Sequence, residues 1–188
     1  MSIKFGIVRA RCRIGFLSLP VIAASTFLLP SPHASAGALD LTCTPPSSET
    51  VTYNPPVTMT PQPTTATVST VFGPCVSATN PAVTAGSRSL TAPLTRSCLQ
   101  LLDSGGPYLV TITWNTGQTS TLTLNRVTNV AGAVITVTQT GTVTGGLFSG
   151  DTVVMTATAP STDVLNCTLG LGTVSSTYST VVLEITSA

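Results

Sequence analysis

Alternation of β-branched and apolar residues with a period of two is the feature that most constrains the fold of this chain. The clearest case is Tyr108–Trp114, in which Tyr108, Val110, Ile112 and Trp114 fall on one face of an extended segment. After residue 36, threonine accounts for 35 of 152 residues and valine for 18. Both residues are stiff at χ1 and fit a pleated sheet better than a helix. No segment shows helical periodicity over two turns, and the chain is predicted to be all-β.

Eight or nine short strands are expected, separated by residues that favour turns. The segment 115–118, with Gly117, is a polar turn that predicts a hairpin between 108–114 and 119–124. Pro55-Pro56 and 61–63 indicate an extended connection or an edge strand. The other expected strands lie near 39–44, 50–53, 65–73, 87–99, 134–143, 152–158 and 179–186.

Short strands at this spacing are typical of sandwiches and barrels. We favour a two-sheet, immunoglobulin-like sandwich of antiparallel strands, with a β-barrel as the alternative. The Thr- and Pro-rich stretch 58–67 is too short to separate two domains, so residues 37–188 are predicted to form a single domain.

The first 36 residues have the order of a cleavable secretory signal peptide. A basic region up to Arg13 is followed by sixteen mostly apolar residues at 14–29, and Ala34-Ser35-Ala36 supplies the small residues of a cleavage site. The apolar run is shorter than the roughly 20 residues needed to span a bilayer. The protein is therefore expected to be secreted, with no transmembrane segment after cleavage.

Charge is sparse in the remaining 152 residues, which hold three arginines, six carboxylates, no lysine and no histidine. So few bases exclude a nucleic-acid binder that works by neutralising phosphates. Without His or Lys, neither a Ser–His–Asp mechanism nor a Schiff base is available. No metal or cofactor site is indicated, because no C-x-x-C spacing occurs and no His remains.

Four cysteines follow the predicted cleavage site, and an even number in a secreted chain predicts two disulfides. Three pairings are possible among Cys43, Cys75, Cys98 and Cys167, of which we favour Cys43–Cys75 with Cys98–Cys167.

Carboxylate chemistry is the catalytic alternative that remains. The segment 101–106, Leu-Leu-Asp-Ser-Gly-Gly, resembles the catalytic loop of aspartic proteases. No second Asp-Ser/Thr-Gly occurs in the chain, and the same six residues are also typical of a polar turn before a strand. A hydrolase would pair Asp103 with Asp151 or Asp163.

Three runs, at 73–77, 114–121 and 144–151, resemble a group of small, Thr-rich secreted proteins of actinomycete-type bacteria. The resemblance implies secretion and a β fold, and it carries no activity and no functional residues.

The function expected from the sequence is a non-catalytic extracellular module, structural or binding, that acts at the cell envelope or in the medium. Its Thr-covered strands suit contacts with cell-wall glycans or self-association through edge strands. Tyr108 and Trp114 share a face and could form a glycan-stacking platform, but the aliphatic residues between them favour a place in the core.

Overall fold

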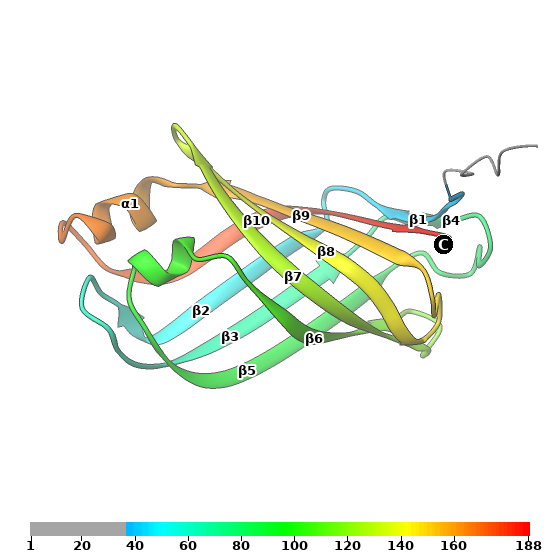
Figure 1. The fold of residues 1–188 in the computed structure, drawn as a ribbon, viewed down its shortest axis with the longest axis horizontal. Coiled ribbons are helices and arrows are strands. Elements are labelled where there is room, and N and C mark those ends of the chain that lie inside the picture. The colour runs from blue at the N-terminus through cyan, green and yellow to red at the C-terminus, as the bar shows by residue number, and fades with distance from the viewer. Residues whose placement is uncertain (1–36) are drawn as a thin grey trace, which may run out of the picture. The chain divides into compact units, whose positions relative to one another are not determined.

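The computed structural model describes residues 37–188, so the predicted signal peptide lies outside the described residues. These residues form ten strands, one 3-10 helix and one α-helix (Figure 1). The strands are β1 (Leu39–Cys43), β2 (Ser48–Val57), β3 (Gln62–Phe72), β4 (Cys75–Ser77), β5 (Gly86–Arg96), β6 (Gly105–Trp114), β7 (Thr119–Ala131), β8 (Val134–Gly146), β9 (Thr152–Pro160) and β10 (Val174–Thr186). The helices are η1 (Leu99–Leu102) and α1 (Thr162–Thr168).

Eight of the strands form a closed antiparallel barrel in which each strand pairs with the next barrel strand along the chain, β4 being left outside the ring. The order is β2-β3-β5-β6-β7-β8-β9-β10, and β10 pairs back onto β2 to close the ring. The first half of β10 pairs with β2 and its second half pairs with β1, to which β4 adds as a further outer strand.

The all-β class is confirmed, and the architecture corresponds to the barrel alternative rather than to the favoured immunoglobulin-like sandwich. The deciding contact is the β2–β10 ladder, which runs from Ser48↔Thr180 to Thr52↔Ser176 and leaves no break between two sheets there. Closure is possible because several strands are longer than expected; β7, β8 and β10 each have 13 residues. Long, tilted strands are what a closed barrel requires.

The prolines of β2 sit where its ladder with β10 is interrupted. The register jumps between Thr52↔Ser176 and Val57↔Val174, and Pro55 and Pro56, which have no backbone N–H to donate, lie in this gap. On the other side, Thr64 Oγ1 donates to the Pro55 carbonyl at 2.6 Å and Gln62 Nε2 to the Pro56 carbonyl at 2.7 Å. Side chains thus replace missing backbone bonds, and the strand continues through the prolines.

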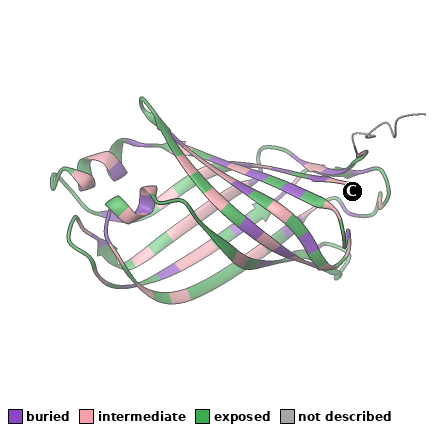
Figure 2. Cartoon of the chain, in the orientation of Figure 1, coloured by how far each residue is buried: buried purple, intermediate pink, exposed green. Residues whose placement is uncertain are grey.

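Alternation decides which residues face the barrel interior, and burial alternates along the strands (Figure 2). In β10, which covers the strand expected at 179–186, Val181, Leu183 and Ile185 are buried and Glu184 is exposed. Gly117 has a φ of +82° in the turn between β6 and β7, which confirms the predicted hairpin.

Two hydrophobic clusters occupy the interior. The larger cluster contains Trp114, Phe72, Met155 and the inward residues of β1 and β10, and Trp114 meets Phe148 edge-on with ring centroids 5.9 Å apart. The smaller cluster joins Val57 and Val174 to η1 and α1. The sequence did not predict these helices, which have only four and seven residues.

The structure confirms two disulfides and the favoured pairing. Cys43–Cys75 links β1 to β4, and Cys98–Cys167 links the residue before η1 to α1. Disulfides are typical of proteins in oxidising compartments. Across residues 37–188, no helix has the length and apolar character needed to cross a membrane.

Candidate ligand-binding cavity

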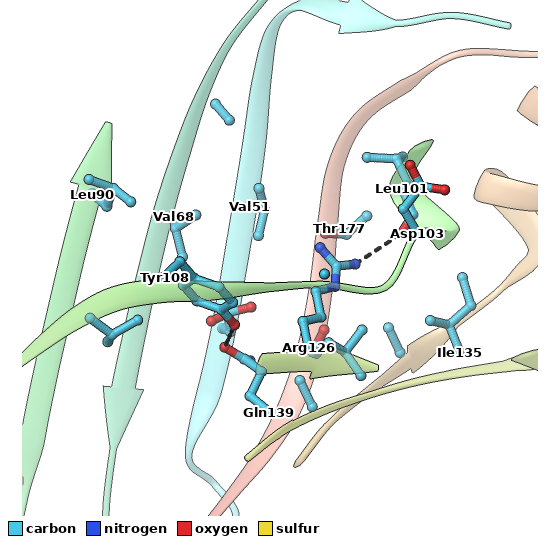
Figure 3. Close-up of a pocket in the computed structure, with 18 of the residues that line it drawn as sticks. Val51, Val68, Leu90, Leu101, Asp103, Tyr108, Arg126, Ile135, Gln139 and Thr177 are labelled. Carbon is cyan, nitrogen blue, oxygen red and sulfur yellow. Dashed lines mark hydrogen bonds between the residues drawn. The ribbon is translucent and has the colours of Figure 1, made fainter. Parts of the chain in front are cut away.

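A cavity of about 670 Å³ lies inside the barrel (Figure 3). Its lining combines inward-facing residues of the barrel strands with Leu101 of η1 and Val164 of α1. Leu101 and Val164 belong to the smaller hydrophobic cluster, while Val110 and Ala157 belong to the larger one, so the cavity adjoins both. Its volume falls within the roughly 300–1,000 Å³ of small-molecule sites.

The cavity exists because the interior positions between the two clusters carry short side chains. Ala66 and Val68 of β3, Ala157 and Ala159 of β9 and Ser179 of β10 all line it. An eight-stranded barrel is just wide enough for side chains to fill or for one small ligand to enter. Trp114, Phe72 and Met155 fill the larger cluster, whereas alanine and valine leave space in the cavity.

The cavity reaches the surface where β5 and β6 separate. Their ladder consists of Gly86↔Trp114 and Ser87↔Thr113, whereas β5 pairs with β3 continuously from Phe72↔Gly86 to Gln62↔Arg96. A Cβ at Gly86 would come within 2.6 Å of the Trp114 ring, so glycine is required where the two strands meet. Beyond this point the two strands diverge (Figure 1).

Leucines mark the rim of this opening. Leu90 of β5 is 58% exposed and Leu109 of β6 is 68% exposed, and both line the cavity. Leu90 is on the inward row of β5 together with Arg88 and is paired with Val68 of β3, yet it remains accessible because β6 does not pair with β5 at this level. Exposed apolar side chains that are continuous with an interior cavity suit the entry of an apolar molecule.

One ion pair lies on the cavity wall. Glu49, Thr70 and Arg88 stand at the same level on β2, β3 and β5 and point inward. The Arg88 guanidinium donates to Glu49 Oε2 and, through Nε, to Thr70 Oγ1 at 2.8 Å; Thr70 Oγ1 donates to Glu49 Oε2 at 2.8 Å. The charges of Glu49 and Arg88 therefore compensate each other.

A second polar pair crosses the interior. The Tyr108 hydroxyl on β6 donates to Gln139 Oε1 on β8, and Gln139 is 4% exposed (Figure 3). Burial raises the pKa of Tyr108 above its usual value, and the nearby Arg88 and Arg126 oppose the rise. The phenol therefore stays neutral at physiological pH, and this pair adds no charge to the cavity.

Arg96 and Arg126 bring two further positive charges into the cavity lining. Arg96 Nη1 donates to the Gln100 carbonyl at 3.0 Å, and Arg126 Nη2 donates to the adjacent Leu101 carbonyl at 2.8 Å. The carbonyls of η1 thus hold both guanidiniums at one end of the cavity, where Arg126 projects inward (Figure 3). Among residues 37–188, no carboxylate forms an ion pair with either arginine.

Tyr53 of β2 lines the cavity near these two arginines. Burial raises the pKa of Tyr53, while the positive charges of Arg126 and Arg96 pull it down. Both arginines therefore lie within electrostatic reach of the Tyr53 phenol, which remains protonated at neutral pH and is able to donate a hydrogen bond.

The carboxylates singled out in the sequence are distributed over different places. Asp103 follows η1, is exposed and lines the cavity. Asp151 hydrogen-bonds with Asp40 in the turn between β8 and β9, which lies at the end of the barrel opposite to η1 (Figure 1). Asp163 is exposed in the first turn of α1 and is not part of the cavity lining. The structure thus brings neither Asp151 nor Asp163 into the cavity with Asp103.

The contact between Asp40 and Asp151 predicts a dependence of stability on pH. Burial, together with the hydrogen bond and the charge of Asp40, raises the pKa of Asp151 above its ordinary 3.8. The folded state thus binds this proton more tightly than the unfolded state, and stability is lost as the pH rises through the folded pKa. Asp151→Asn is expected to raise Tm at pH 7 by a small amount and to reduce the gain in Tm on acidification.

Thermal melts at pH 7 and at pH 4 measure this effect, with Asp163→Asn as the matched control on an exposed helix. A fall in Tm at pH 7 for Asp151→Asn, or an equal rise for Asp163→Asn, would contradict the interaction between Asp40 and Asp151 as the cause of the pH dependence.

Of the two aromatic residues considered for glycan stacking, Trp114 is 2% exposed and belongs to the core. Its Nε1 donates to Ser120 Oγ at 2.8 Å. Tyr108 lines the cavity instead of an outer surface. The preference for core over a stacking platform is therefore confirmed for Trp114.

The sequence analysis did not single out the three arginines. One signal was available: Arg126 continues the inward row of Leu122 and Leu124 along β7, and a charge on an apolar row indicates an interior polar site. The same signal marks Arg88 and Arg96, which stand at the two ends of the row of Leu90 and Leu94 along β5.

Comparison of the chain with family models, curated proteins and solved structures finds no match.

Proposed function

We propose that this protein is a secreted, non-catalytic binding module that holds one small, mainly apolar molecule inside its barrel. The observation that carries the proposal is the cavity of about 670 Å³, walled by alanine, valine and leucine and open to the surface between β5 and β6. Pockets with apolar walls and a few placed polar groups are the usual form of small-molecule sites.

The arrangement of titratable groups supports binding over catalysis. The carboxylates in the cavity lining are Glu49 and Asp103; Glu49 is neutralised by Arg88, and Asp103 is exposed. A hydrolase that used Asp103 with Asp151 or Asp163 would need both groups in one pocket about 5 to 9 Å apart. Asp151 and Asp163 lie outside the cavity lining, so the geometry favours the binding module over this alternative.

Secretion is part of the proposal. The order of basic, apolar and small residues at 1–36 and the two disulfides support it together. A ligand-binding barrel in the cell envelope or the medium is consistent with both.

The proposal is tested by titration of the mature protein with N-phenylnaphthylamine, a neutral dye that fluoresces in apolar surroundings. We expect saturable enhancement at one dye per protein, with a dissociation constant in the micromolar range or tighter. A linear, unsaturated signal, or binding by the urea-unfolded chain alone, would contradict the proposal.

A further inference from the structure

The distribution of charge singles out one end of the cavity. Residues 37–188 retain three cationic side chains against six carboxylates, yet all three cations line this one cavity. Scattered surface charges would not gather in this way on the inward rows of two strands, β5 and β7. The lining holds three arginines against Glu49 and Asp103, so the cavity carries a positive net charge, whereas residues 37–188 as a whole carry a negative one (three arginines against six carboxylates).

Arg88 is already neutralised by Glu49, which leaves Arg96 and Arg126 to account for the excess. A guanidinium offers five N–H donors. Arg126 uses Nε for Thr128 Oγ1 at 3.2 Å and Nη2 for Leu101, and Arg96 uses Nη1 for Gln100. The partners of both within residues 37–188 are neutral oxygens, and several donors on each remain open.

Half-buried charges of this kind are unfavourable unless a counter-ion meets them. The two guanidiniums are held by the carbonyls of adjacent residues, Gln100 and Leu101, so an oxyanion at this end of the cavity would meet two positive charges with open N–H donors. The Tyr53 hydroxyl lies within electrostatic reach of the same place. The remaining cavity wall, with Val51, Val68 and Leu90, is apolar.

Resting on the function proposed above, we infer that the ligand is an anionic amphiphile: an apolar body in the barrel that ends in one carboxylate or similar oxyanion at Arg96 and Arg126. Glu49 does not suit a cationic ligand, because Arg88 and Thr70 already occupy its Oε2. Asp103, exposed near the same end, opposes an anion and lowers its affinity.

The test compares three ligands that share one alkyl chain, namely dodecanoic acid, dodecanol and dodecylamine, as competitors of N-phenylnaphthylamine at pH 8. The acid is expected to bind at least about tenfold more tightly than the alcohol, because a hydrogen bond to a charged group contributes binding free energy of that size. The amine is expected to bind more weakly than either. Equal affinities for acid and alcohol, or a preference for the amine, would overturn the inference.

Variants assign the preference to the two arginines. Each of the variants Arg96→Gln and Arg126→Gln should lower the affinity for dodecanoic acid to nearly that for dodecanol. The affinity for dodecanol itself should change by less than about threefold. Arg126→Lys, which keeps the charge, should retain a preference for the acid, and Asp103→Asn should strengthen it. A preference for the acid that survives in both Gln variants would overturn the inference.

Two outcomes separate this inference from the proposed function. If the dye and dodecanol bind but the acid is not preferred, the inference fails while the binding module stands. If neither the dye nor any of the three amphiphiles binds, the proposed function itself fails. Should Arg126→Gln not fold because η1 loses its contact, the comparison of the three ligands on the unaltered protein still decides.

Discussion

Val68→Phe is expected to lower the affinity of the cavity for N-phenylnaphthylamine by at least about a hundredfold. Val68 points inward from β3, lies at the level of Val51 and Leu90, and lines the cavity (Figure 3). A phenyl ring at this position occupies the space that the ligand needs. Because the ring enters an existing cavity instead of a filled core, the free energy of unfolding should change by less than about 1 kcal/mol.

The same strand offers a matched control. Val71 also lies on β3 but faces outward and is 56% exposed, so Val71→Phe adds the same group outside the barrel. Dye titration of both variants, with thermal melts to confirm folding, separates a filled cavity from a general effect of phenylalanine. Unchanged binding in Val68→Phe, or an equal loss in Val71→Phe, would place the dye outside the cavity.

Removal of the Cys98–Cys167 disulfide is expected to cost about 4 kcal/mol of unfolding free energy, or about 10 °C in Tm. The bridge closes a separation of 69 residues and joins η1 to α1, which form one end of the barrel interior. Both sulfurs lie in the smaller hydrophobic cluster, and both cysteines are fully buried. The double variant Cys98→Ala with Cys167→Ala, followed by urea denaturation, measures the loss.

Removal of Cys43–Cys75 serves as the comparison, since it closes a separation of 32 residues outside the barrel ring. Removal of Cys43–Cys75 should lower the free energy of unfolding by a comparable amount but leave the cavity intact. Removal of Cys98–Cys167 should also weaken dye binding, because η1 positions Leu101 and the two arginines. A Cys98–Cys167 variant with unaltered stability would show that this bridge does not brace the helical end.

Individual strands could be predicted from the sequence because alternation is a local property. The inward rows of β6 and β10 follow directly from Val110, Ile112, Val181 and Leu183, and the hairpin at Gly117 follows from turn chemistry. Closure could not be predicted in this way. The same alternation occurs in the strands of sandwiches and of barrels. Which of the two architectures forms depends on pairing between β2 and β10, which lie more than 100 residues apart in sequence.

The cavity was beyond sequence reasoning for a related reason. Ala66 and Ala159 are ordinary small residues in their own strands, and only strand register places them around one space. Arg96 and Arg126 both donate to adjacent carbonyls of η1, a helix of four residues that no periodic pattern indicates. Of the carboxylates singled out in the sequence, Asp103 lines the cavity, whereas Asp151 and Asp163 lie elsewhere.

The most direct measurement of the central claim is a set of intermolecular nuclear Overhauser effects between bound N-phenylnaphthylamine and the valine methyl groups. If one small apolar molecule sits inside the barrel, contacts are expected to the inward methyls of Val51, Val68 and Val137, which line the cavity. Contacts confined to the outward methyls of Val71 and Val76, which are 56% and 75% exposed, would contradict the account.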